Sequence, residues 1–142
     1  MNYKDPSQQL LKAYQNILQG QIVYGSEQIT IGTRIPRKKN KYVLIYIESA
    51  IPNNTGDSII YNIMMGMQIV SMQAISEGDE TVINSILDQV LNIVGNEEAI
   101  LMADFNCLNS QFADMDPIEP EMTEANYTIT KKLRMQHFIE QK

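Results

Sequence analysis

The sequence predicts an α+β domain, in which a mainly antiparallel sheet with a long central hairpin carries two helices packed on one face. Three patterns lead to this fold class. Residues 41–75 have the composition of two consecutive strands, two other segments carry apolar residues at helical spacing, and the last segment alternates apolar with polar residues. The length of 142 residues fits a single domain, residues 1–142, with one hydrophobic core.

The central hairpin is expected to consist of strands at residues 42–51 and 58–75, joined by a turn at residues 52–57. The first strand is β-branched, aromatic or apolar at almost every position, and the turn contains Pro, Asn, Gly and Asp. Both faces of the first half of this strand are apolar, so we expect that half to be covered on both sides.

The second strand of the hairpin is longer than a domain of this size needs for its own core. We expect it either to bend near Gly66 or to leave the domain and meet another subunit. A helix is the competing interpretation, because several apolar residues also fit a period of 3.6. A strand is preferred because Tyr, Ile and Val dominate and Gly66 would weaken a helix. The residues that fit the helical period are Ile59, Ile60, Ile63, Met64 and Met67.

Two helices are expected outside the hairpin, at residues 6–18 and 80–94. Asp5 as N-cap and Pro6 at the first helical position mark the start of the first helix, and Gly20 follows its last apolar residue. The second helix begins after acidic residues and ends before Gly95. The apolar stripes are Leu10, Leu11, Tyr14, Ile17 and Leu18 in the first helix, and Val82, Ile83, Ile86, Leu87, Val90, Leu91 and Val94 in the second.

The remaining segments are less regular. Residues 21–35 hold two short apolar pieces, which are either an irregular strand pair or an extended segment that crosses the sheet. Residues 99–108 begin with strand composition, and residues 109–125 are expected to be a long acidic loop with prolines. Residues 126–140 alternate apolar with polar side chains and predict a closing strand with one buried and one wet face.

Charge is distributed unevenly along the chain. The net charge is −6, which argues against nucleic-acid binding by the whole surface and leaves only a local contact. A basic loop at residues 34–41 is either a solvated loop at a strand end or a flexible loop that contacts phosphate. Its cations are Arg34, Arg37, Lys38, Lys39 and Lys41, and the acidic loop at residues 109–125 contains Asp114, Asp116, Glu119, Glu121 and Glu124.

No pattern in the sequence predicts catalysis, a cofactor or a metal. There is no serine elbow, phosphate-binding glycine loop or pair of neighbouring cysteines. The one histidine, His137, is expected to be a packed or surface residue rather than a base. Asp104, Asp114 and Asp116 are the one set that suggests a divalent cation, but a solvated loop or one docked on a basic partner is preferred. We therefore expect a binding or structural protein rather than an enzyme.

The single cysteine and the uncharged segment at residues 58–76 indicate the environment in which the protein is expected. Cys107 excludes an intrachain disulfide and is expected to be a small buried hydrophobe in a reducing environment. The N-terminus lacks the pattern of a signal peptide. Residues 58–76 are uncharged, but polar residues recur through them, which favours a sheet and no contact with a membrane. These polar residues are Asn62, Gln68, Ser71 and Gln73.

The order and length of the elements resemble the tail terminator or tail completion proteins of tailed bacteriophages. The matching features are the capped helix at residues 6–18, a basic proline loop before the hairpin, and a return strand that leads directly into the second helix. The Val23-Tyr24 segment precedes that loop, and the last strand ends with Arg134-Met135-Gln136-His137-Phe138. The resemblance spans most of the chain but includes no diagnostic motif.

This resemblance implies a structural virion protein of the neck or tail, assembled in the host cytoplasm. Proteins of that family form closed rings around the DNA channel and use sheet edges and loops to contact neighbours. For this chain it implies a homo-oligomeric ring that contacts other connector or tail proteins and makes non-specific contact with channel DNA. The basic loop would face either this DNA or the acidic loop of the next subunit. The acidic loop and the overlong strand depart from the family pattern. Two interpretations therefore stay open, a tail terminator and another ring of the head-to-tail connector.

A second function class stays open beside the ring. A small α+β module that binds a ligand or regulates a partner would need a pocket, and no pocket motif is recognisable in the sequence.

Overall fold

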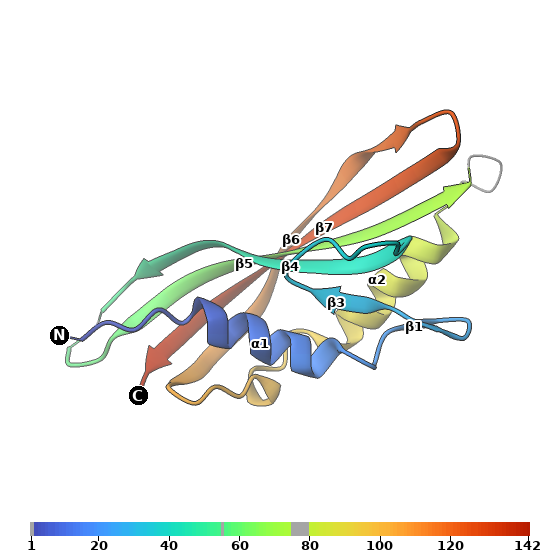
Figure 1. The fold of residues 1–142 in the computed structure, drawn as a ribbon. Helices are drawn as coiled ribbons and strands as arrows, with labels where there is room; N and C mark the ends of the chain where they lie inside the picture. Colours follow the sequence, from blue (N-terminus) through green and yellow to red (C-terminus); the bar gives the residue numbers. More distant parts are fainter. Residues whose placement is uncertain (1, 55, 75–79) are drawn as a thin grey trace.

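The computed structural model describes residues 2–54, 56–74 and 80–142 of the chain. These residues form two α-helices, a short 3₁₀ helix and seven strands, in the order drawn in Figure 1. The elements are α1 (Ser7–Leu18), β1 (Val23–Tyr24), β2 (Glu27–Gln28), β3 (Thr30–Gly32), β4 (Lys41–Pro52), β5 (Ile60–Ala74), α2 (Thr81–Ile93), η2 (Glu97–Ala99), β6 (Phe105–Met122) and β7 (Asn126–Gln141).

Five strands form the main sheet, in the order β3-β4-β5-β7-β6. All neighbours are antiparallel except β3 and β4, which run parallel over Tyr42–Leu44 of β4. Strands β1 and β2 form a separate small hairpin. The predicted α+β class with a mainly antiparallel sheet is confirmed. Of the two short apolar pieces in residues 21–35, the first contains β1, which pairs with β2, and the second contains β3, the edge strand beside β4.

Both helices cover the same face of the sheet, below it in Figure 1. Their apolar stripes pack on the strand residues that point to that face, because successive side chains in a strand alternate between faces. Alternate residues of β5 are buried, from Tyr61 through Met65 to Ile69, and those of β7 are buried from Ile129 to Ile139 with the exception of Lys131. The core therefore lies between the helices and one face.

None of the described helices lies on the other face of the sheet (Figure 1). Leu44 and Tyr46 point to this side and are half-buried. The expectation that the first half of β4 is covered on both sides is therefore wrong: side chains of neighbouring strands shield these residues, and no secondary-structure element of the described chain does. This surface is called the open face below.

Strand β5 stays within its own domain over its whole described length. Its residues pair with β4 on one side and with β7 on the other, and the strand passes through Gly66 without interruption. The helical alternative for this segment is wrong, and so is the alternative in which the strand leaves the domain to meet another subunit. The predicted residue Ile75 and the start of the second helix at residues 76–79 lie outside the described residues.

The prediction of a long acidic loop at residues 109–125 is wrong. Most of it belongs to β6, and the chain turns only at residues 123–125 before β7 begins. Acidic residues and prolines are unfavourable inside a sheet but are tolerated at its edge and at bulges. Strand β6 is the edge strand, with Pro117 opposite Lys131 and Pro120 inside a bulge between Ile118 and Glu121.

The start of α1 agrees with the sequence in its chemistry and differs by one residue in its boundary. The helix begins at Ser7, and the carboxylate of Asp5 accepts a hydrogen bond from the backbone N–H of Ser7 at 2.9 Å. This bond lowers the pKa of Asp5. Gly20 follows the helix with φ of +85°, a conformation that glycine adopts without strain.

Candidate functional site

A ladder of ion pairs crosses the open face from β4 to β6. Glu48 on β4 reaches over β5 to Lys132 and Arg134 on β7, and its carboxylate lies 3.1 Å from Arg134 Nε. Arg134 Nη1 lies 2.8 Å from Asp114 and 2.9 Å from Asp116 on β6. Strand alternation places all five side chains on the same face. One arginine thus links three carboxylates on two strands.

Hydrogen bonding favours the charged forms of Glu48, Lys132 and Arg134 in this ladder. The bond from Lys132 is the main reason why the pKa of Glu48 lies below its usual value, and the Arg134 contacts add to it. The carboxylates of Asp114 and Asp116 raise the pKa of Arg134, and the bond to Glu48 raises the pKa of Lys132. With three anions and two cations, the ladder carries a net charge of about −1, which makes the open face a poor surface for the phosphates of DNA.

The two acids expected to dock on a basic partner are therefore held within the chain. Asp114 and Asp116 face Arg134 rather than solvent alone, while Glu119, Glu121 and Glu124 lie exposed near the tip of the β6–β7 hairpin. Glu48, Lys132 and Arg134 also belong to this ladder, and no sequence pattern predicted them as site residues. The signal that could have found them is the alternation of charge on β7, once β6 is recognised as its neighbour.

The basic loop connects β3 to β4 at the opposite edge of the sheet. Arg34, Arg37, Lys38 and Lys39 are exposed, and Lys38 has φ of 58°, in the left-handed region. Lys41 differs from the other cations, because it is the first residue of β4 and lies 3.1 Å from Glu27. The structure thus presents a cationic loop at one sheet edge and the acidic hairpin at the other.

Strand β6 also exposes apolar side chains. Phe112 and Met115 are 48% and 41% exposed, although they lie on the same side of the sheet as the helices. Their partners on β7, Met135 and Leu133, are fully buried. The core is therefore open along this edge of the sheet.

A buried polar cluster lies beneath α1, where the helix packs on β6 and β7. The Tyr14 hydroxyl lies 2.5 Å from His137 Nε2 and 3.0 Å from Ser110 Oγ. Burial lowers the pKa of His137 to about 4 and raises that of Tyr14. Among the described residues, His137 Nδ1 has no hydrogen-bond partner. The prediction of a packed histidine is confirmed, and its neutral ring is part of the core.

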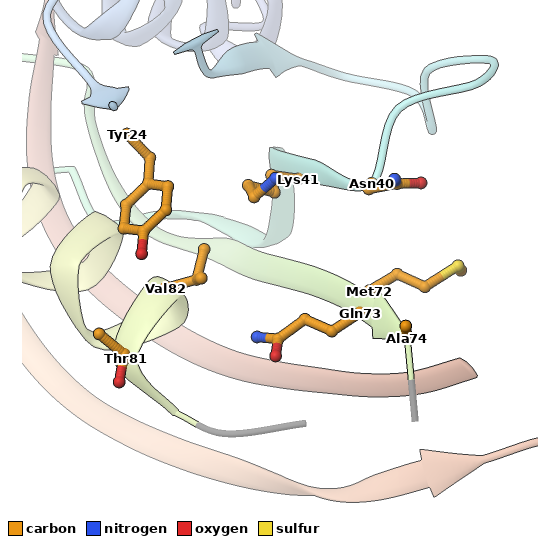
Figure 2. Close-up of a pocket in the computed structure, with 8 residues that line it drawn as sticks. All are labelled: Tyr24, Asn40, Lys41, Met72, Gln73, Ala74, Thr81 and Val82. Carbon is orange, nitrogen blue, oxygen red and sulfur yellow. The ribbon is translucent and has the colours of Figure 1, made fainter. Parts of the chain in front are cut away.

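A cavity of about 550 Å³ opens between the ends of β5 and β1 and the start of α2. In Figure 2 the Tyr24 ring points toward Val82, and the Gln73 side chain points toward Thr81. Asn40, Lys41, Met72 and Ala74 complete the described lining. Residues 75–79, which follow β5 and precede α2 in the sequence, lie outside the described residues. The one charged group in the described lining is Lys41, which is already paired with Glu27.

The carboxylates considered as metal ligands do not gather at one place. Asp104 accepts a hydrogen bond from Gln9 at 2.7 Å and pairs with Lys4, while Asp114 and Asp116 pair with Arg134. Within residues 2–54, 56–74 and 80–142, no three His, Cys, Asp or Glu side chains are grouped to hold a metal ion.

Cys107 is a half-buried thiol near the start of β6. Burial raises its pKa to about 11, and its Sγ lies 3.5 Å from the carbonyl of Asn109. A thiol with this pKa stays protonated at neutral pH, in agreement with a packing role. None of the described helices is both long and apolar enough to cross a membrane.

The fold has a counterpart among solved structures. It is similar to a chain in the virion of a native gene transfer agent particle, with a TM-score of 0.64 and 10% sequence identity. The match covers 78% of this chain and 78% of that chain. At this identity the likeness shows a shared fold. No protein-family model and no curated protein sequence matches the chain.

Proposed function

We propose that this chain is a non-enzymatic structural subunit of a virion. The observation that carries this proposal is the shared fold with a chain of the gene transfer agent virion over 78% of both chains. The resemblance to phage tail terminators, which rests on the order of elements in the sequence, points independently in the same direction.

Within the virion, the chain forms a homo-oligomeric ring of the head-to-tail connector or tail terminator around the DNA channel. The distribution of charge supports such a ring. The basic loop lies at one edge of the sheet and the exposed acids Glu119, Glu121 and Glu124 lie at the other, so a head-to-tail contact brings opposite charges together. Its other partners are connector or tail proteins of the same particle.

The basic loop makes either the contact to the next subunit or a contact to channel DNA. Its four exposed cations are suited to both, because phosphate and carboxylate attract the same groups. The nearly balanced charge of the open face leaves this loop as the stronger candidate for contact with DNA.

Charge reversal of the loop tests these roles. The variant Lys38→Glu with Lys39→Glu is compared with Lys12→Glu with Lys142→Glu, which makes the same change of charge at other exposed lysines. We expect only the loop variant to lose self-association or binding to a duplex DNA fragment, measured by light scattering and by gel shift. If both properties are unchanged, the loop has neither role.

A second candidate function is a small ligand-binding module, favoured by the cavity of about 550 Å³ beside Tyr24 and Val82. A strictly monomeric protein that is stabilised against thermal unfolding by a small molecule would support this function over the ring.

A further inference from the structure

We propose that copies of this chain join by pairing the outer edge of β6 in one copy with the outer edge of β4 in the next. The pairing segments are residues 109–115 of β6 and residues 45–51 of β4. This inference rests on the proposed ring and deepens it, since it names the strands that carry the contact and the register between them.

Both edges are free at the same level of the sheet. Strand β3 covers β4 only at Tyr42–Leu44, and the segment around η2 covers β6 only near its start, through the bridge between Leu101 and Asn106. These two covered stretches lie at opposite ends of the sheet. Between them, the described chain places no strand beside residues 45–51 of β4 or residues 109–115 of β6.

The register across the sheet fixes which residues would meet. Ser49 on β4 is opposite Met64, Met64 is opposite Gln136, and Gln136 is opposite Gln111 on β6. When one sheet continues into the next without a stagger, Gln111 of one copy therefore lies beside Ser49 of its neighbour.

The strand directions are compatible with this contact. Each of the pairs β4–β5, β5–β7 and β7–β6 is antiparallel, so β4 and β6 run in opposite directions within one copy. Copies related by rotation about a ring axis, with their sheets side by side, bring β6 of one antiparallel to β4 of the next. The contact is heterologous, so it differs from a two-fold dimer and gives the proposed ring when the rotation between copies closes.

The apolar side chains at the free edge of β6 become shielded from solvent in this arrangement. By the same register, Phe112 lies at the level of Ile47 and Met115 at the level of Ile45. Ile45 is fully buried and Ile47 packs against the core on the side where α1 lies on β4. Pairing therefore places the exposed Phe112 and Met115 beside Ile47 and Ile45 at the core edge of the next copy.

The charges at the far end of the contact also match. The bulge at residues 119–120 of β6 lies at the level of Ile129 on β7. Ile129 is opposite Ser71 on β5, and Ser71 is opposite Lys41 on β4, so the bulge and Lys41 lie at the same level of the sheet. The exposed Glu119 and Glu121 of one copy are then brought to the end of β4 where the basic loop of the next copy enters. Three register shifts interrupt β6, and residues 109–112 and 114–118 form the regular stretches between them.

Disulfide formation tests the register directly. The variant Ser49→Cys with Gln111→Cys, in a Cys107→Ala background, places thiols on residues whose Cα atoms would lie about 4.5–5.5 Å apart, within the range of a disulfide. Mild oxidation is expected to give covalent oligomers on a non-reducing gel. Ser49→Cys alone, Gln111→Cys alone, and Ser49→Cys with Lys12→Cys serve as controls and are expected to give none.

A charge on the β6 edge provides a second test that does not depend on oxidation. Phe112→Lys is expected to leave a folded monomer, with an unchanged far-ultraviolet dichroism spectrum, because lysine on an edge strand opposes pairing. Leu101→Lys, at an exposed apolar residue outside both the pairing segment and the charged end of the contact, is expected to keep the oligomer.

The outcomes separate this inference from the ring itself. One set of results would reject strand pairing but keep the ring. In that case the unmodified protein assembles, Phe112→Lys also assembles, and Ser49→Cys forms no disulfide with either Gln111→Cys or Asn109→Cys. If the unmodified protein stays monomeric at every concentration, self-assembly fails and the pairing fails with it.

Discussion

The ring of Tyr46 on β4 lies over Gly66 on β5, in a place that any side chain at position 66 would occupy. A Cβ built on Gly66 would be 2.5 Å from Tyr46 Cζ. Lys132 Nζ lies 5.5 Å from the centre of the same ring, and Gln68 donates a hydrogen bond of 3.5 Å to its hydroxyl. Glycine is unfavourable inside a strand, and this aromatic cover accounts for its presence here.

Replacing Gly66 with alanine is expected to lower the free energy of unfolding by about 1–2 kcal/mol, because the Tyr46 ring must move off β5. Gly32→Ala is the control, since a Cβ there meets nothing closer than 3.7 Å. Chemical denaturation measures both. Combining Gly66→Ala with Tyr46→Ala should remove most of the Gly66 effect, and additive losses would show that the ring is not its cause.

Arg134 is expected to stabilise the open face in a salt-dependent way. Arg134→Gln removes the shared partner of three carboxylates, so the protein should unfold at a lower temperature in about 0.01 M salt. The difference from the unmodified protein should shrink in about 1 M salt, where screening is strong. Arg37→Gln, in the exposed basic loop, removes the same charge and should have little effect. Equal losses in both salts would exclude an ionic cause.

Tyr14 holds the buried polar cluster together through its hydroxyl. Tyr14→Phe keeps the ring but leaves Ser110 and His137 without that partner, at an expected cost of about 1–3 kcal/mol in unfolding free energy. Tyr127→Phe, at a half-buried tyrosine on the strand that carries His137, is the matched control and should be near neutral. A neutral result for Tyr14→Phe would mean that this cluster adds no stability.

His137 makes the protein sensitive to mild acid. Its pKa is about 4 in the folded state, below the ordinary value of 6.5, so protonation favours the unfolded chain. Stability is full above pH 6.5 and falls as the pH drops toward 4, by about 3 kcal/mol over the whole range. The slope between pH 6.5 and 5 should vanish in His137→Gln, measured by urea unfolding. A slope that persists there would assign the acid sensitivity to other groups.

The sequence was sufficient to predict elements whose pattern depends only on neighbouring residues. The stripe from Val82 to Val90 predicts α2, and the run from Tyr42 to Ile47 with its turn predicts the hairpin, because periodicity and turn chemistry depend on neighbours in the chain. The packed role of His137 was also predicted correctly.

The sequence was insufficient to predict features that depend on contacts between residues far apart in the chain. Strand β6 has poor strand composition around Pro117 and Glu119, and its pairing with β7 is what makes it a strand. The ion-pair ladder joins Glu48 to Arg134, 86 positions away, and requires the order of strands in the sheet. The contact between Tyr14 and His137 depends likewise on where α1 lies on the sheet.

Self-assembly is the central claim, and the mass of the protein in solution tests it most directly. Light scattering across a concentration series, at low and moderate salt, is expected to show a closed oligomer, or a monomer that associates as concentration rises and loosens with salt. A strict monomer at every concentration and salt would contradict the self-assembling ring and favour the small ligand-binding module.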